Sequence, residues 1–292
     1  MQEGGDGTGY AAASDGAKVT RPIKPDPAAY YGVRVIKRIP ALPGAVFQSD
    51  SPFRRLPRDL DAKQRRFLEA LRFGIEMAQG SYRRLREILS AMSLDDQQTL
   101  DKHSDAVATA FLDAWGVADS IHRLRELLAV MPNLKKGALL KLFSRKTQQV
   151  EKLRNHIQHL SGDLHEPALA RMPVWGTVSW VWLVDRTHMK VISGSMLAGV
   201  DMGQSPRPFP IPQNRIFHDV LDHVTLSLGN DELNLSEAMR LTVRIARGLE
   251  KQLEVVFRDC EPLPLVDSRL LLTIELDAPV AIAPAKLDEK VS

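Results

Sequence analysis

The sequence has 292 residues, of which 26% are charged, and a formal net charge of +3 at pH 7. This length suffices for one large domain or two smaller ones with a substantial core. The single cysteine, Cys260, excludes an internal disulfide framework and a cysteine-based zinc site, and it favours a reducing, cytoplasmic location. No apolar run reaches the roughly 20 residues that span a bilayer, and the N-terminus lacks the pattern of a signal peptide. The mildly basic charge permits an anionic partner such as RNA without requiring one.

The N-terminal quarter of the chain shows no helical periodicity. Residues 1–25 are rich in glycine, alanine and serine, which predicts a disordered tail. Residues 26–58 contain many prolines and one short strand-like run at 33–37, so we expect an arm that lies over the core.

Residues 59–170 have the pattern of a helical bundle. Apolar residues recur in alternating three- and four-residue steps over 68–92, 107–131 and 150–164, which predicts three amphipathic helices. Gly162 is the expected end of the third helix. The connections are short, so neighbouring helices are expected to be antiparallel.

The character of the sequence changes after Pro173, over a predicted α+β region at 173–280. An aromatic and β-branched run at 174–184 is expected to pair with 188–197 across a polar turn. Two further short runs flank residues 229–231 and predict a second hairpin. Ser236 is the expected N-cap of a helix over 237–257.

A last strand is predicted at 270–276, and residues 281–292 are expected to form a tail. The fold class that follows is mainly α, with an antiparallel helical bundle and an appended small α+β region.

One short stretch of the third predicted helix could carry chemistry. It reads RNHIQH, from Arg154 to His159, with an arginine, a polar Asn155 and a histidine after four intervening residues. This stretch resembles the signature of the HEPN superfamily of helical-bundle nucleotide-binding and ribonuclease proteins. The resemblance covers about residues 59–166 and does not extend to the region after Pro173.

The resemblance implies metal-independent RNA cleavage by Arg154, Asn155 and His159, without a metal or cofactor. The histidine would exchange a proton with the 2′-hydroxyl or the leaving oxygen, and the arginine would hold the phosphate. Asn155 would orient one of them by hydrogen bonding. In this family two bundles typically form a homodimer that shares the site.

The spacing of the motif bears on this hypothesis. Arg154 and His159 lie roughly 140° apart around an ideal helix, so they would meet at one phosphate more easily across a dimer interface. The function that the resemblance implies is a metal-independent RNA endonuclease, or an RNA- or nucleotide-binding protein, of a bacterial defence or toxin type. The alternative is a non-catalytic helical interaction or scaffold protein with an unidentified protein partner.

Other polar and aromatic side chains have simpler interpretations. The motif region has three histidines: His156, His159 and His165. We do not expect them to form a metal site, because they are not closely paired and have few acidic residues nearby. Three residues of the second predicted helix lie away from its apolar stripe, and we expect them to have packing roles rather than catalytic ones: Trp115, Asp119 and His122. Trp180 and Trp182 share one face of a strand and are expected in a core or an interface.

Overall fold

The structure is a computed structural model that describes residues 44–94, 100–131, 137–159, 173–185, 190–198 and 217–262. All of these residues belong to one compact unit, which spans residues 36–292. Several sequence predictions lie outside the described residues: the tails at 1–25 and 281–292, most of the arm, and the strands at 33–37 and 270–276.

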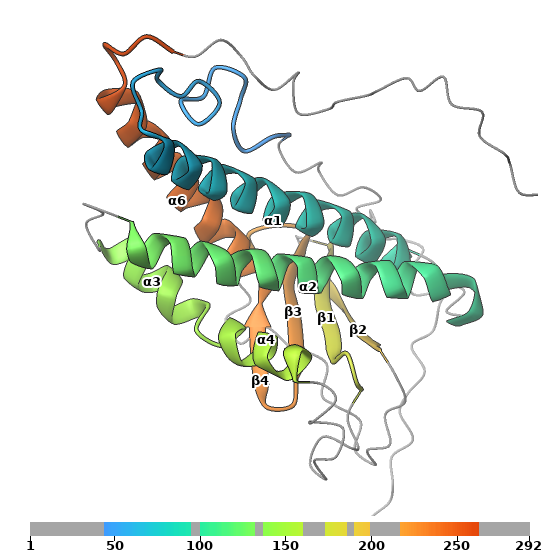
Figure 1. The fold of residues 1–292 in the computed structure, drawn as a ribbon. Helices are drawn as coiled ribbons and strands as arrows, with labels where there is room; N and C mark the ends of the chain where they lie inside the picture. Colours follow the sequence, from blue (N-terminus) through green and yellow to red (C-terminus); the bar gives the residue numbers. More distant parts are fainter. Residues whose placement is uncertain are drawn as a thin grey trace, which may run out of the picture. The chain divides into compact units, whose positions relative to one another are not determined.

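Two long helices form the largest element of the fold. α1 (Ala62–Leu94) and α2 (Leu100–Val130) run in opposite directions side by side, as Figure 1 shows. Both helices were predicted, and their apolar stripes are confirmed as core: Leu71, Leu85 and Leu89 of α1 and Ala110, Val117 and Ile121 of α2 are completely buried. Burial of one stripe per helix, rather than intrinsic propensity, stabilises helices of this length.

The third predicted helix is shorter than expected and is preceded by another. α3 (Ala138–Lys146) was not predicted, and it ends where the buried Thr147 donates its hydroxyl to Phe143 O at 2.7 Å. α4 (Val150–Gln158) then begins after one turn. The predicted end at Gly162 is wrong, because His159 already caps α4 by donating its backbone N–H to Asn155 O at 2.9 Å.

Within the described residues, four antiparallel strands form one sheet. β1 (Thr177–Asp185), β2 (Lys190–Leu197), β3 (Leu221–Leu228) and β4 (Asp231–Asn234) lie in the order β2-β1-β3-β4. The two predicted pairings, β1 with β2 and β3 with β4, are confirmed. Gly229 adopts φ 63° in the turn between β3 and β4, a conformation that suits glycine.

α6 (Leu235–Val256) follows β4 directly. The predicted helix is confirmed, but its N-cap is Asn234, whose side chain accepts a hydrogen bond from Glu237 N at 2.8 Å. Ser236 was the predicted cap and is instead buried within the helix, where it contacts β3 and α1. The predicted cap was wrong by two residues because serine and asparagine are both favoured at the N-cap of a helix.

The fold class was predicted wrongly. Among the described residues, five helices and a four-stranded sheet form a mixed α+β fold, not a mainly α bundle with an appendage. The sheet and the long helices share one core: Trp180 of β1 donates its indole N–H to Ser93 of α1 at 2.8 Å, and Tyr82 of α1 reaches Ser236 of α6. Amphipathic patterns predict that a face is buried but do not identify its partner, and here the helices pack on the sheet as well as on each other.

No helix in the described part of the chain combines the length and the apolar character needed to cross a membrane. Trp180 and Trp182 are buried, which confirms their predicted place in a core.

Candidate functional site

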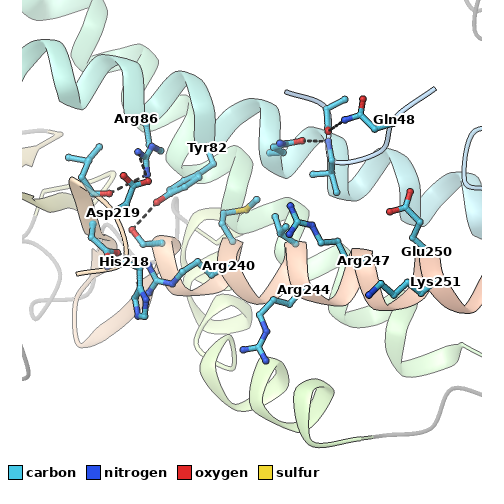
Figure 2. A pocket seen from close by; sticks show the side chains of 18 of the residues that line it. Gln48, Tyr82, Arg86, His218, Asp219, Arg240, Arg244, Arg247, Glu250 and Lys251 are labelled. Atoms are coloured by element: carbon cyan, nitrogen blue, oxygen red, sulfur yellow. Dashed lines mark hydrogen bonds and ion pairs between the residues drawn. The ribbon is translucent and has the colours of Figure 1, made fainter. Parts of the chain in front are cut away.

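A cleft of about 660 Å³ lies between α1 and α6. Four segments that are distant in the sequence form its walls: residues 45–48, one face of α1, residues 218–222 at the start of β3, and one face of α6. Figure 2 shows α6 along one side of the cleft, with Tyr82 and Arg86 reaching toward it from α1. None of the four segments alone carries a recognisable binding motif.

The 45–48 wall is held on α1 by Gln79. The Gln79 side chain accepts a hydrogen bond from Val46 N at 2.9 Å and donates one to Gly44 O at 2.7 Å. Phe47, next in the chain, is completely buried and packs on Phe53 with 4.6 Å between ring centroids. This segment is therefore a fixed wall of the cleft.

At one end of the cleft, Arg86 connects α1 to the segment that leads into β3. Its side chain is 5% exposed, and it donates a hydrogen bond to Leu221 O at 3.2 Å. Its Nη2 lies 2.8 Å from Asp219 Oδ2 in an ion pair without a well-aligned hydrogen bond. The charge of Arg86 is thus already matched by a carboxylate.

Asp222 organises the same end of the cleft. It is 0% exposed and accepts hydrogen bonds from His218 N at 2.8 Å, His223 N at 2.8 Å and Arg240 Nη1 at 2.7 Å. Burial alone would raise the pKa of Asp222, but the His218 N–H, Arg240 and the His223 N–H outweigh it and hold the pKa below its ordinary value. Asp222 therefore remains a carboxylate that orients Arg240.

A β-bulge explains how Asp222 turns inward. Between the pairs Ser179–Thr225 and Val181–Asp222, β1 advances two residues and β3 advances three. The additional residue bends β3, and His223 adopts φ 53°, which is uncommon for a residue with a side chain. The hydrogen bonds of Asp222 to His218 and His223 offset the cost of this backbone conformation.

Tyr82 forms the floor at this end. Its hydroxyl donates to Ser236 Oγ at 2.8 Å, and Ser236 Oγ also accepts Val224 N at 2.9 Å. Burial raises the pKa of Tyr82, an effect that Arg86 and Ser236 partly oppose. The phenol is therefore a neutral hydrogen-bond donor committed to the fold.

A cationic stripe runs along the wall formed by α6. Its members follow one another at intervals of four, three and four residues, which places them on one face of the helix: Arg240, Arg244, Arg247 and Lys251. Figure 2 shows Arg247 rising from α6 toward α1, whereas Arg244 points to the other side of α6. The sequence analysis missed this stripe, although its spacing was visible in the sequence.

The charges that line the cleft do not cancel completely. Among the lining residues are five cationic side chains and four carboxylates. Arg86 is paired with Asp219 and Arg240 with Asp222. The remaining charged residues have no ion pair with a described residue: Arg244, Arg247 and Lys251 against Glu250 and Glu254. Because Arg244 points to the other side of α6, Arg247 is the cation of this group that reaches toward α1.

Apolar side chains fill the space between the charged groups. Val46 comes from the 45–48 segment, Leu221 from β3, and Met239 and Val243 from α6. Met239 and Leu221 are buried, while Val46 and Val243 are half-buried. The cleft thus offers an apolar surface beside a cationic group, Arg247, that pairs with no described residue.

The predicted motif lies elsewhere, on α4. Arg154 Nε is 3.5 Å from Asp119 Oδ1 of α2, and Asp119 also accepts a hydrogen bond from Arg123 at 2.7 Å. Asn155 and His159 are exposed, and His159 is the residue that ends α4. The structure thus places Arg154 against α2, whereas no described contact joins it to His159.

An open groove of about 540 Å³ between α1 and α2 reaches the partner of Arg154. Asp119 lines this groove together with small residues from both helices: Gly80, Ser81, Gly116 and Ser120. The motif arginine is therefore connected, through Asp119, to a surface depression on the chain.

The remaining candidate residues have packing or pairing roles. Trp115 is half-buried and donates its indole N–H to Trp175 O at 3.1 Å, and His122 is buried with Nε2 3.4 Å from Glu126 Oε1. His156 Nε2 lies 3.3 Å from Asp231 Oδ2 and ties α4 to β4. Across the described ranges, no group of three or more histidine, cysteine, aspartate or glutamate side chains is placed to hold a metal ion.

Comparisons of this chain with protein-family models, with curated proteins and with solved structures found no match.

Proposed function

We propose that the protein is a binding protein that holds an organic anion in the cleft between α1 and α6. One observation carries this proposal: Arg247 points into a cavity of about 660 Å³ without an ion pair to a described residue. Ligand sites typically have volumes of roughly 300–1,000 Å³ and combine apolar walls with a few polar groups. The α1–α6 cleft has both properties.

The arrangement of the cleft favours binding over catalysis. Tyr82 and Asp222, which could otherwise exchange protons, are buried and hydrogen-bonded within the fold. Arg86 and Arg240 are fixed by carboxylates from the segment that leads into β3 and from β3 itself. A wall that is already ordered loses little conformational entropy when a ligand binds.

Thermal unfolding of the full chain with AMP and, separately, with decanoate tests the proposal. A ligand that binds the folded state raises the melting temperature by mass action. We expect at least one probe to stabilise the wild-type protein and to have a weaker effect on Arg247→Glu. The matched control is Arg66→Glu, at an exposed position of α1 that does not line the cleft. The proposal is rejected if neither probe stabilises the protein, or if Arg66→Glu and Arg247→Glu respond equally.

A second candidate function is the RNA cleavage that the Arg154–His159 motif predicts. Its support is the exposure of Asn155 and His159 and the contact of Arg154 with Asp119, a residue of the α1–α2 groove. A second copy of the chain would have to complete this site, since Arg154 is occupied by Asp119 in the single chain.

Cleavage of a mixed RNA pool in EDTA by wild-type protein and by His159→Ala tests this second candidate. Cleavage by the wild type alone would establish a metal-independent ribonuclease that uses His159. Cleavage by neither protein, with both folded and dimeric, would remove the hypothesis. The same proposal includes a homodimer and a cytoplasmic location. The single cysteine favours the cytoplasmic location.

A further inference from the structure

We infer that the ligand of the α1–α6 cleft is an amphipathic organic monoanion, with its charged group at Arg247 and its apolar body against Met239 and Val243. This inference rests on the proposed function, because it specifies the chemistry of the anion that the cleft would bind.

Arg247 can hold one anionic group. Arg86 and Arg240 are already paired with Asp219 and Asp222. Of the lining cations that pair with no described residue, Arg247 rises toward α1, whereas Arg244 points to the other side of α6 (Figure 2). We therefore expect the charged group of the ligand at Arg247.

The position of the free carboxylates argues against a polyanion. Glu250 follows Arg247 by three residues on α6 and lines the same cleft, as does Glu254 one turn further. A phosphate chain or a nucleic-acid backbone that extended along α6 from Arg247 would bring further phosphates beside these carboxylates. Such like charges repel, which disfavours a polyanion extended along this wall.

The apolar lining supplies the second half of the inference. At the end of the cleft formed by Tyr82 and Leu221, α6 contributes the apolar lining residues Val243 and Met239. The polar groups at that end are already bonded to one another, as in the Tyr82–Ser236 pair. A ligand that enters this end therefore finds mainly apolar contacts and gains by burying an apolar body there.

The experiment compares two probes that differ in charge. Anilinonaphthalene sulfonate has an apolar aromatic body and one sulfonate, and phenylnaphthylamine has the same aromatic body without charge. Both are titrated by fluorescence into the full chain, and AMP, a small polar dianion, is tested as a competitor. We expect the sulfonate to bind at least about tenfold more tightly than the neutral amine and than AMP, as the loss of a charge-assisted contact implies.

Two variants localise the probe. Arg247→Glu should weaken sulfonate binding by about tenfold or more and leave binding of the neutral amine nearly unchanged. Ala45→Trp, at an exposed position of the opposite wall, should weaken both aromatic probes by narrowing the cleft. Arg66→Glu should leave the affinity for both probes unchanged. The melting temperature of each variant reports on its folding.

The outcomes separate this inference from the proposed function. If AMP binds as tightly as the sulfonate and Arg247→Glu weakens it, the amphiphile is rejected while anion binding stands. If the neutral amine binds as tightly as the sulfonate, the required negative charge is rejected. If no anion binds at Arg247, both the inference and the proposed function fall.

Discussion

Two arginine–carboxylate pairs mark the two regions that compete for a functional role. Arg240 and Asp222 meet in the cleft, where the carboxylate is completely buried and also accepts two backbone N–H groups. Arg154 and Asp119 meet at the motif, where 44% of the Asp119 side chain and 32% of the Arg154 side chain are exposed. The cleft pair belongs to a fixed polar network, whereas the motif pair is a surface contact that solvent screens.

The difference shows that a short sequence motif and a binding site can lie in different parts of the molecule. Arg154, Asn155 and His159 are recognisable in sequence because they are close together in the chain. The cleft is formed by residues that come from four separated segments, and the polar groups at its Asp222 end are buried and bonded to one another. Preorganisation of this kind, rather than the presence of a short pattern, indicates a surface that can bind.

Replacement of the buried carboxylate should have the largest effect on stability. We expect Asp222→Ala to lower the free energy of unfolding by about 3–5 kcal/mol, because it leaves Arg240 and two backbone N–H groups without their partner. Asp119→Ala, at the exposed pair, should lower it by no more than about 1 kcal/mol. Urea unfolding of both variants measures the difference, and equal losses would contradict the comparison.

The pH dependence of stability should identify Asp222 as a charged group. Its folded pKa lies below the ordinary value, so its contribution is present above about pH 4 and is lost as the pH falls through the folded pKa. Asp222→Asn should therefore cost about 1.5–3 kcal/mol at neutral pH and progressively less below pH 4. Urea unfolding of both proteins across this pH range measures the loss in free energy of unfolding. A loss that does not change with pH would show that the charge of Asp222 does not contribute to stability.

A smaller loss is expected from the floor of the cleft. Tyr82→Phe removes the hydrogen bond to Ser236 but keeps the buried ring, so it should destabilise the protein by about 0.5–1.5 kcal/mol. Tyr82→Leu, which also removes the ring, should cost more. Thermal unfolding compares the two variants, and a Tyr82→Phe variant as stable as the wild type would show that the hydroxyl contributes nothing.

The smallest effect is expected at the motif. His159→Ala changes an exposed residue at the end of α4, and it should alter the free energy of unfolding by less than about 0.5 kcal/mol. Urea unfolding measures it. A loss of 2 kcal/mol or more, on the scale of a buried polar group, would show that His159 has a structural partner beyond those among the described residues.

The sequence predicted local elements well because periodicity is a local property. The stripes of α1 and α2, the pairing of β1 with β2 and the turn at Gly229 all follow from spacing within one segment. The fold class was wrong because the pattern of Leu71 or Ile121 shows that a face is buried without showing against what. Helix ends were also imprecise: Asn234 rather than Ser236 caps α6, and α4 stops at Gln158.

The candidate site was less predictable than the fold. The spacing of Arg240, Arg244, Arg247 and Lys251 on α6 was available from the sequence, but the same pattern describes many solvated helix faces. What distinguishes it is the opposite wall, where Val46, Tyr82 and Asp219 come from three separate segments. Tyr82 in turn contacts Ser236, which lies 154 residues further along the chain. Only tertiary packing brings these residues together.

The central claim is tested most directly by calorimetric titration of decanoate into the wild-type chain, Arg247→Glu and the double variant Arg154→Ala/His159→Ala. The cleft account predicts that the motif variant binds decanoate like the wild type and that Arg247→Glu loses about tenfold or more in affinity. If the motif variant loses binding while Arg247→Glu retains it, the functional surface is the one around α4 and the cleft account is contradicted.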